Sequence, residues 1–165
     1  MAQTKLGDRV VNTAGELPAI GSPAPEFTLV GNDLKEVSSV NFAGKSVVMN
    51  IFPSIDTSTC ATSVREFNKR ASSLSNTVVL CISKDLPFAM RRFCGAEGID
   101  KVTTLSDFRN LGFSRAYGVE MLEGAMTGFF ARSIVVIGPD GKVKHTEMVP
   151  AVGQEPNYEA ALKAI

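Results

Sequence analysis

Two apolar runs constrain the fold of this chain more than any other feature of its sequence. Val47–Phe52 is too apolar to leave either face of a strand in water, and Thr77–Ile82 is a second unbroken run, rich in β-branched residues. Between them, apolar side chains recur at the three- and four-residue steps of an amphipathic helix, at Cys60, Val64, Phe67, Ala71 and Leu74. A helix between two buried strands predicts an α/β fold, with a sheet covered by helices.

The remaining patterns extend this layout to a mixed central sheet flanked by helices. Further strands are expected at Phe27–Val30, Val102–Leu105, Ile134–Ile137 and Lys142–Met148, and the Gly7-Asp8 turn predicts an N-terminal β-hairpin extension. The helix that contains Cys60 is expected to end near Ser75-Asn76. Three more helices are expected: one capped by Asp85 and stopped by Gly95, one over Asp107–Tyr117 closed by Gly118, and one from Asn157 to Ile165.

Composition restricts the class of protein. The chain has 165 residues, enough to bury the core of a single domain spanning residues 1–165. Its 17 basic and 17 acidic side chains cancel, so we expect neither a nucleic-acid nor a membrane-surface partner. No apolar run approaches the roughly 20 residues of a membrane span, and Met1–Asp8 has no signal-peptide segment. These features predict a cytoplasmic protein.

One cysteine lies at the predicted start of a helix. Four capping-type residues follow one another from Asp56 to Thr59, and with Thr57 as the N-cap, Cys60 falls in the first helical turn. Free backbone N–H groups and the helix dipole favour an anion at that position. The thiol of Cys60 is therefore biased toward thiolate, the form that attacks electrophiles.

The other two cysteines carry weaker signals. Cys81 lies in the middle of a predicted buried strand and is interpreted as a small core residue. Cys94 precedes Gly95 at a predicted helix end, where its composition favours packing and reactivity about equally. The chain has no Cys-x-x-Cys pair and only one histidine, His145, so no metal site is expected.

Pro53, Thr57 and Cys60 fit the pattern Pro-x-x-x-Thr-x-x-Cys, and in this the chain resembles the peroxiredoxins, whose active-site signature this is. Four longer segments look like the bacterial thiol peroxidases, the atypical two-Cys peroxiredoxins whose second cysteine lies in the same chain: Asn50–Thr57, Ser83–Ala89, Arg92–Gly98 and Ala131–Ile137. The resemblance covers nearly the whole chain. It implies a thioredoxin-like fold, in which Thr57-x-x-Cys60 replaces the redox Cys-x-x-Cys.

The resemblance also implies a reaction and its residues. Cys60 reduces hydrogen peroxide or an organic hydroperoxide to water or an alcohol and becomes a sulfenic acid, which Cys94 converts to an intramolecular Cys60–Cys94 disulfide. Arg132 maps onto the arginine that contacts the reactive sulfur, Thr57 helps to bind the peroxide oxygens, and Pro53 shields the thiolate from water. Thioredoxin is the implied reductant, a homodimer the implied assembly and antioxidant defence the implied role, without metal, flavin or nicotinamide.

Other interpretations of the same residues stay open at this stage. Without the resemblance, Arg132 is interpreted as one partner of a surface salt bridge. Arg65 is the alternative candidate for the cation beside the reactive sulfur. His145 as the base of a cysteine hydrolase is a second option. A cysteine-dependent phosphatase needs an arginine six positions after its cysteine, where this chain has Glu66. A thioredoxin-fold binding or chaperone module is the non-enzymatic alternative. The apolar segment Met121–Phe130 is open between substrate groove, dimer face and core.

Overall fold

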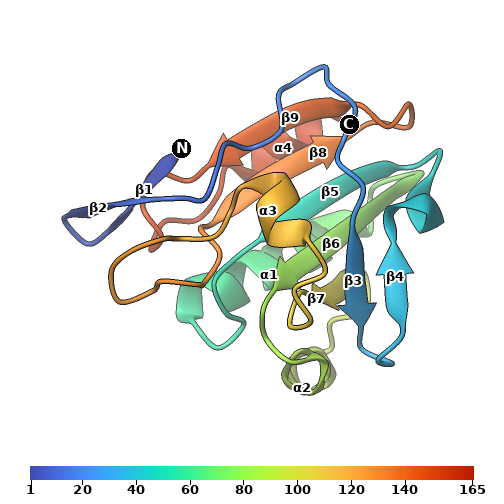
Figure 1. The fold of residues 1–165 in the computed structure, drawn as a ribbon. Coiled ribbons are helices and arrows are strands. Elements are labelled where there is room, and N and C mark those ends of the chain that lie inside the picture. Colours follow the sequence, from blue (N-terminus) through green and yellow to red (C-terminus); the bar gives the residue numbers. More distant parts are fainter.

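The computed structural model describes residues 1–165 and is built on a mixed seven-stranded sheet (Figure 1). The strands lie in the order β4-β3-β7-β6-β5-β8-β9. The pairs β5–β6 and β6–β7 are parallel, and the other neighbouring pairs are antiparallel. The strands are β3 (Thr28–Gly31), β4 (Glu36–Ser38), β5 (Ser46–Ile51), β6 (Thr77–Ser83), β7 (Thr103–Ser106), β8 (Ser133–Ile137) and β9 (Val143–Met148).

The central strands are buried on both faces. Along β5, Val47, Met49 and Ile51 belong to one hydrophobic cluster, whereas Val48 and the following Phe52 belong to another on the opposite face. β6 and β8 alternate between the two clusters in the same way. Because neither face meets water, these strands have continuous apolar sequences rather than alternating ones. The expected α/β architecture is confirmed.

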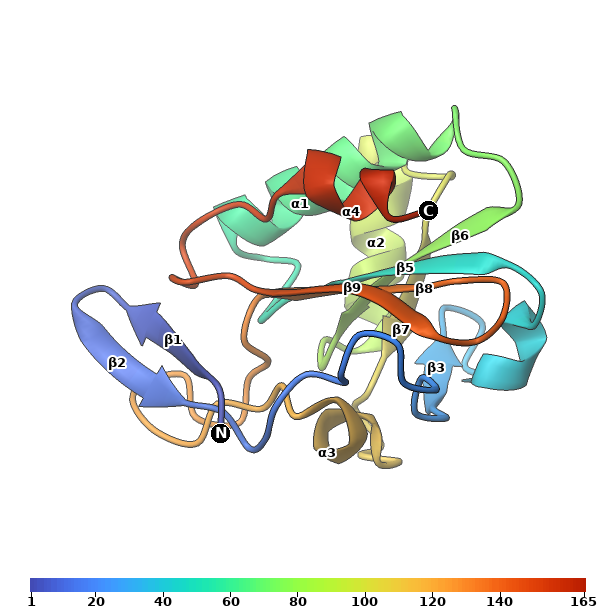
Figure 2. The same cartoon turned by 90° about the horizontal axis from the view of Figure 1, so that it is seen from above.

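Helices cover both faces of the sheet (Figure 2). On one face lie α1 (Ser58–Ala71), α2 (Pro87–Glu97) and α4 (Tyr158–Lys163), and on the other lie α3 (Phe113–Tyr117) and the N-terminal hairpin. The helix α1 connects the parallel strands β5 and β6, and its apolar stripe packs against them. None of the helices combines the length and apolar composition needed to cross a membrane.

The predicted N-terminal hairpin is present, and the last two predicted strands of the sheet form a second hairpin. Strands β1 (Gln3–Leu6) and β2 (Arg9–Asn12) pair around a turn in which Gly7 has a φ of 60°. Strands β8 and β9 pair around a turn in which Gly141 has a φ of 77°. A positive φ is readily adopted only by glycine and a few polar residues, so these turns are well marked in the sequence.

The predicted limits of α2 are wrong at both ends. The helix continues through Cys94 and past Gly95, and it ends at Gly98, whose φ of 67° is left-handed. A glycine within a helix costs only ~1 kcal/mol, so Gly95 does not stop it. Leu86 rather than Asp85 occupies the N-cap position, and it makes no side-chain cap hydrogen bond. The second cysteine is therefore within a helix and not at its end.

The other three predicted helices are longer than the observed ones, α4 by the smallest margin. The helix α3 begins at Phe113 instead of Asp107, because positive φ angles at Asn110 (52°) and Gly112 (105°) interrupt a helix before it. The helix α1 ends at Ala71, before the predicted Ser75-Asn76. The short strand β4 and the 3₁₀ helix η1 (Ser39–Phe42) were not predicted, since neither is long enough to show a period.

Candidate active site

The first turn of α1 holds Cys60 against the sheet. Thr57 is the N-cap, as predicted, and its Oγ1 atom accepts a hydrogen bond from the N–H of Cys60 at 3.2 Å. The Thr57 hydroxyl donates to the carbonyl oxygen of Ser54 at 3.3 Å. Cys60 is fully buried and belongs to the hydrophobic cluster between α1 and the sheet. Thr57 therefore fixes the turn that places the sulfur.

Arg132 brings a positive charge to this sulfur. Its Nη2 atom lies 3.2 Å from Sγ of Cys60, and its Nε atom donates to the carbonyl oxygen of Val152 at 2.9 Å. Arg132 directly precedes β8, whose Ser133 pairs with Ile51 at the end of β5. This register places the arginine next to the loop that leads into α1. Two segments far apart in the sequence thus meet at one sulfur.

The charge of Arg132 has no carboxylate to balance it. The residue is 1% exposed, forms no salt bridge, and its Nη1 atom is buried without a hydrogen-bond partner. A buried charge is strongly unfavourable unless an opposite charge compensates it. Of the two groups that accept hydrogen bonds from this guanidinium, only the sulfur of Cys60 can become an anion. The geometry therefore places an uncompensated positive charge against the sulfur of Cys60, and it leaves Nη1 as a free donor beside it.

Asp85, which we assigned to a helix cap, instead supports the loop before α1. Its Oδ2 atom accepts hydrogen bonds from the N–H of Ile55 at 2.7 Å and from the hydroxyl of Ser83 at 2.6 Å. Its Oδ1 atom accepts one from the hydroxyl of Ser54 at 2.8 Å. Pro53 lies buried in the same loop. A signal was available in the sequence: parallel strands end at the same sheet edge, so polar residues after β6 meet the loop after β5.

Cys94 lies in α2, over a different part of the sheet. It is half-buried and faces β7, and burial raises the pKa of its thiol while a hydrogen bond with Thr104 opposes this. It borders a surface pocket of about 400 Å³. The other lining residues come from the β3–β4 region and from the segment around β7: Gly31, Asn32, Asp33, Val37, Ile99, Val102, Thr103, Thr104 and Leu105.

The two sulfurs cannot bond without movement. Cys60 contacts Arg132, which directly precedes β8, whereas Cys94 lies against Thr104 of β7. Two strands, β6 and β5, lie between β7 and β8, and neighbouring strands are ~4.8 Å apart, so the separation is on the order of 10–15 Å. Cα atoms joined by a disulfide lie ~4.4–6.8 Å apart. Both cysteines are free thiols in this structure.

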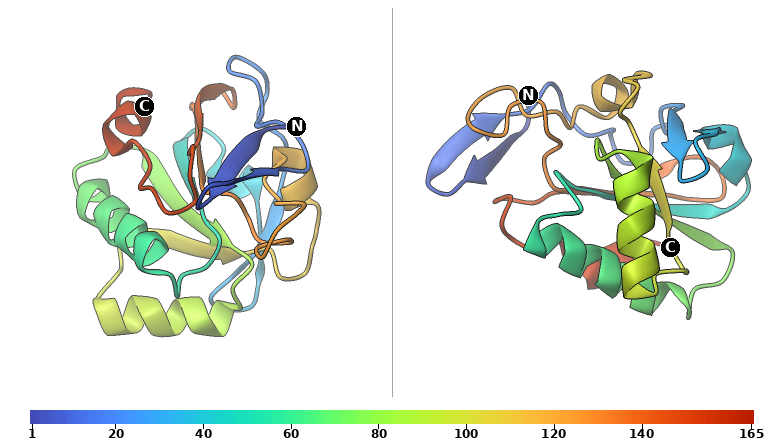
Figure 3. Two further views of the ribbon diagram at one scale, coloured as in Figure 1. Left: turned by 90° about the vertical axis from the view of Figure 1, so that its left-hand side faces the viewer. Right: turned by 90° about the horizontal axis from the view of Figure 1, so that it is seen from below.

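Exposed ion pairs connect the helix of Cys94 to the helix of Cys60 and to the loop that precedes it. The two helices lie side by side on one face of the sheet (Figure 3). Arg65 of α1 binds Glu97 of α2 through two hydrogen bonds of 3.0 and 2.9 Å, and its guanidinium carbon lies 5.6 Å from the ring centroid of Phe93. Arg92 of α2 binds Asp56 at 3.3 Å. Arg65 thus pairs with a carboxylate at the surface and does not contact the sulfur.

Cys81 is confirmed as a core residue. It lies in β6 with no exposed surface. Burial raises the pKa of its thiol to about 12, although a hydrogen bond with Asn50 works in the opposite direction. A thiol with such a pKa is almost entirely protonated near neutral pH and reacts slowly with peroxides. His145, the only histidine, lies in β9 opposite Val136.

The segment Met121–Phe130 divides between core and surface. Met121 and Phe130 are fully buried, whereas Leu122 is 46% exposed and Phe129 is 42% exposed. Met126 is partly buried, so the core interpretation holds fully for two of the segment's five large apolar residues.

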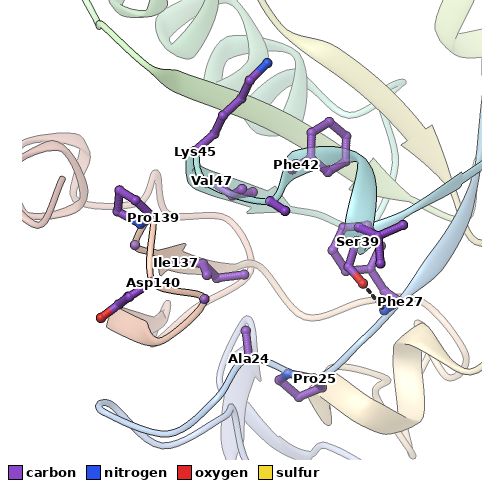
Figure 4. A pocket seen from close by; sticks show the side chains of 15 residues that line it. Ala24, Pro25, Phe27, Ser39, Phe42, Lys45, Val47, Ile137, Pro139 and Asp140 are labelled. Atoms are coloured by element: carbon purple, nitrogen blue, oxygen red, sulfur yellow. Dashed lines mark hydrogen bonds between the residues drawn. The ribbon is translucent and has the colours of Figure 1, made fainter.

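Figure 4 shows a cavity that neither reactive cysteine lines. It has a volume of about 300 Å³ and is located where β5 begins, whereas Cys60 follows the end of that strand. A pocket of about 180 Å³ borders the first turn of α1 and is lined by Ser58, Thr59, Thr62, Gly153 and Glu155. The cavity at the start of β5 therefore lies at the opposite end of that strand from Cys60.

Comparisons with known proteins agree with this geometry. The Redoxin family model matches residues 19–162. A thiol peroxidase of Mycobacterium tuberculosis is 59% identical over 165 residues, which cover 100% of this chain and 99% of the relative. A thiol peroxidase of Corynebacterium glutamicum is 50% identical with the same coverage.

Solved structures show the same fold. A peroxiredoxin-like protein from Aquifex aeolicus is 36% identical and superposes with a TM-score of 0.92, covering 98% of this chain and 95% of that one. A thiol peroxidase from Chromobacterium violaceum has a TM-score of 0.89 at 21% identity, covering 98% and 93% of the two chains. With full-length sequence relatives and this fold, the chain belongs to the Redoxin family and, within it, to the thiol peroxidases.

Proposed function

We propose that this thiol peroxidase uses Cys60 as the residue that attacks the peroxide. The thiolate sulfur attacks one oxygen of a hydroperoxide, the O–O bond breaks, and the sulfur keeps that oxygen as a sulfenic acid. The leaving oxygen takes a proton and departs as water or an alcohol. Hydrogen peroxide and organic hydroperoxides both supply the required O–O bond.

The observation that carries this proposal is the buried Arg132 guanidinium beside Cys60. Its Nη2 atom is 3.2 Å from the sulfur, and its Nη1 atom has no partner. Nη2 favours the thiolate, while Nη1 is free to donate to a peroxide oxygen as negative charge develops on it. Donors aimed at such charge typically contribute ~10²–10³ in rate. Thr57 contributes by holding the first turn, and Pro53 by excluding water from the sulfur.

Cys94 then resolves the sulfenic acid in our scheme. Its sulfur attacks the sulfur of Cys60, the S–O bond breaks, and the oxygen leaves as water while an intramolecular disulfide forms. Because the two sulfurs begin several strand spacings apart, this step follows an opening of the first turn of α1, of the second half of α2, or of both. The surface location of the pairs between these helices supports such an opening.

A dithiol of the thioredoxin type completes the cycle by exchange. One of its thiolates attacks the disulfide, and its second sulfur then displaces the reduced enzyme. The dithiol becomes a disulfide and so returns the two electrons that the peroxide removed. The cycle requires a compartment that supplies reduced dithiols, and we place the enzyme in the cytoplasm as a homodimer that serves antioxidant defence.

A single-turnover experiment tests the proposal. One equivalent of hydrogen peroxide is added to the reduced protein, and the product is followed by intact mass and by a non-reducing gel. The expected product has lost two hydrogens and carries a Cys60–Cys94 linkage in its tryptic map. Thioredoxin, thioredoxin reductase and NADPH then sustain turnover. A chain whose Cys60 keeps its thiol under these conditions is a binding or chaperone module instead.

A further inference from the structure

Asn50 places an amide in the buried interface between β5 and α1. It has no exposed surface, and its Nδ2 atom donates to the Oγ atom of Ser63 at 3.1 Å and lies 3.8 Å from Sγ of Cys81. Its Oδ1 atom is buried without a hydrogen-bond partner. A buried amide with an unsatisfied oxygen destabilises a fold relative to an apolar side chain of similar size. Core packing therefore does not explain an asparagine at this position.

Ser63 connects Asn50 to Cys60 through hydrogen bonds. The Ser63 side chain is fully buried, and its hydroxyl donates to the carbonyl oxygen of Cys60 at 2.8 Å. Serines in helices often bond to a carbonyl one turn earlier. Here the amide of Asn50 also occupies the hydroxyl oxygen, so the hydroxyl proton is directed to that carbonyl. A central strand is thus linked by two hydrogen bonds to the turn that holds the reactive sulfur.

We propose that Asn50 and Ser63 are positioning residues that hold the first turn of α1 closed and set how readily Cys60 leaves to meet Cys94. This inference rests on the proposed function. When the turn opens, the carbonyl of Cys60 moves away, and the hydroxyl of Ser63 stays in the interior without its acceptor. The hydrogen bond exists only in the closed form, so it slows formation of the disulfide. It does not touch the sulfur, and the reaction of Cys60 with peroxide proceeds without it.

The first test compares the two chemical steps in Ser63→Ala. Stopped-flow measurements after one equivalent of hydrogen peroxide give the rate of Cys60 oxidation and the rate of disulfide formation. Loss of one buried hydrogen bond from the closed form predicts about three- to tenfold faster disulfide formation. The oxidation rate changes less than about twofold, because most molecules remain closed. A residue that only stabilises the whole fold would not separate the two rates.

A matched pair of variants isolates the hydroxyl. Ser63→Thr and Ser63→Val add side chains of nearly equal shape, so both strain the interface equally, and only threonine keeps the donor. The disulfide should form more slowly in Ser63→Thr than in Ser63→Val. Ser46→Ala is the control for a buried serine outside the network, at the other end of β5, and it should leave both rates unchanged.

A double-mutant cycle tests whether Asn50 acts through Ser63. Asn50→Ala should accelerate disulfide formation in the wild-type background and add little in the Ser63→Ala background, because the directed hydroxyl is already absent. Equal effects in both backgrounds would show that Asn50 does not act on the turn through Ser63.

Amide exchange of the reduced protein gives a readout that does not depend on catalysis. Exchange across residues 58–63 should be faster in Ser63→Ala, with Thr77–Ile82 unchanged. If exchange and disulfide formation match the wild type, the positioning role is overturned while the proposed function stands. If peroxide leaves wild-type Cys60 unoxidised, the proposed function fails, and exchange alone then decides whether the pair holds the turn.

Discussion

The two cysteines that we assign to the reaction are held in opposite ways. Cys60 is fully buried under the guanidinium of Arg132, and its turn is tied to the sheet by buried hydrogen bonds. Cys94 is half-buried, in a helix linked to α1 by the exposed pair of Arg65 and Glu97. Breaking a buried hydrogen bond without replacement costs ~1–3 kcal/mol. Exposed ion pairs contribute little. We therefore expect the Cys94 side to open first.

The largest expected effect separates the roles of the three cysteines. Cys60→Ser should abolish peroxide reduction, because no other sulfur lies beside a buried cation. Cys94→Ser should consume about one equivalent of peroxide and then stall with thioredoxin as the donor. Cys81→Ser should retain nearly full turnover. Coupled NADPH oxidation measures all three, and a Cys81 variant as inactive as Cys60→Ser would contradict the comparison.

The second prediction compares the two arginines. Arg132→Ala removes both donors next to the sulfur and should slow the oxidation of Cys60 by about 10²–10³. Arg65→Ala is the matched control, since that guanidinium is bound to Glu97 at the surface, and it should leave this step nearly unchanged. Stopped-flow oxidation with hydrogen peroxide measures both variants. If both variants slowed the oxidation equally, the assignment of Arg132 as the cation at the sulfur would be wrong.

The third prediction uses Cys81, a thiol that is buried like Cys60 but has no cation beside it. Burial raises its pKa to about 12 in the folded protein, compared with ~8.5 for a free thiol. The unfolded state therefore ionises first, and the associated stability is complete below pH ~8.5 and is lost as the pH rises toward 12. Between pH 7.5 and 9.5 we expect a loss on the order of 1 kcal/mol.

Urea unfolding of Cys81→Ser at the same two pH values is the control. Serine does not ionise in this range. The free energy of unfolding of Cys81→Ser should therefore fall less than that of the wild type, by the amount that Cys81 contributes. The raised pKa of Cys94 acts in the same direction but is common to both proteins. Parallel pH dependence in the two proteins would mean that Cys81 is more accessible than its burial indicates.

The fourth prediction weakens the Cys94 side. Glu97→Gln keeps the shape of the side chain but removes the charge that Arg65 binds, so α2 should detach more easily. Disulfide formation should accelerate by roughly twofold, as expected for an exposed pair. Added salt should bring wild-type and variant rates together, because it screens the same pair. A variant that forms the disulfide more slowly than the wild type would show that this pair helps to bring the sulfurs together.

The sequence was sufficient for several features that depend on one segment, although not for the helix limits, and it failed for features that depend on two. The strand β5, the N-cap Thr57 and the position of Cys60 follow from local patterns. The contact between Arg132 and Cys60 came only from family resemblance, since the register that joins them spans distant segments. The support of the loop by Asp85 and the buried link from Asn50 were missed, because hydrogen bonds between neighbouring strands and helices leave no local period.

The smallest expected effect tests whether the first turn of α1 is the element that opens. Ser58 is exposed and is the first residue of the helix, and alanine favours helix over serine by roughly 0.5 kcal/mol. Ser58→Ala should therefore stabilise the closed turn and slow disulfide formation by up to about twofold. At Ser63 the same substitution should accelerate that step, because residue 63 stays helical in both forms and only its hydrogen bond to Cys60 is lost. Opposite signs for one substitution at two positions of one helix are expected only if opening is limited to the turn before Ser63. Slower disulfide formation in both variants would mean that the opening of α1 extends past Ser63, whereas unchanged rates in both would assign the opening to α2 alone.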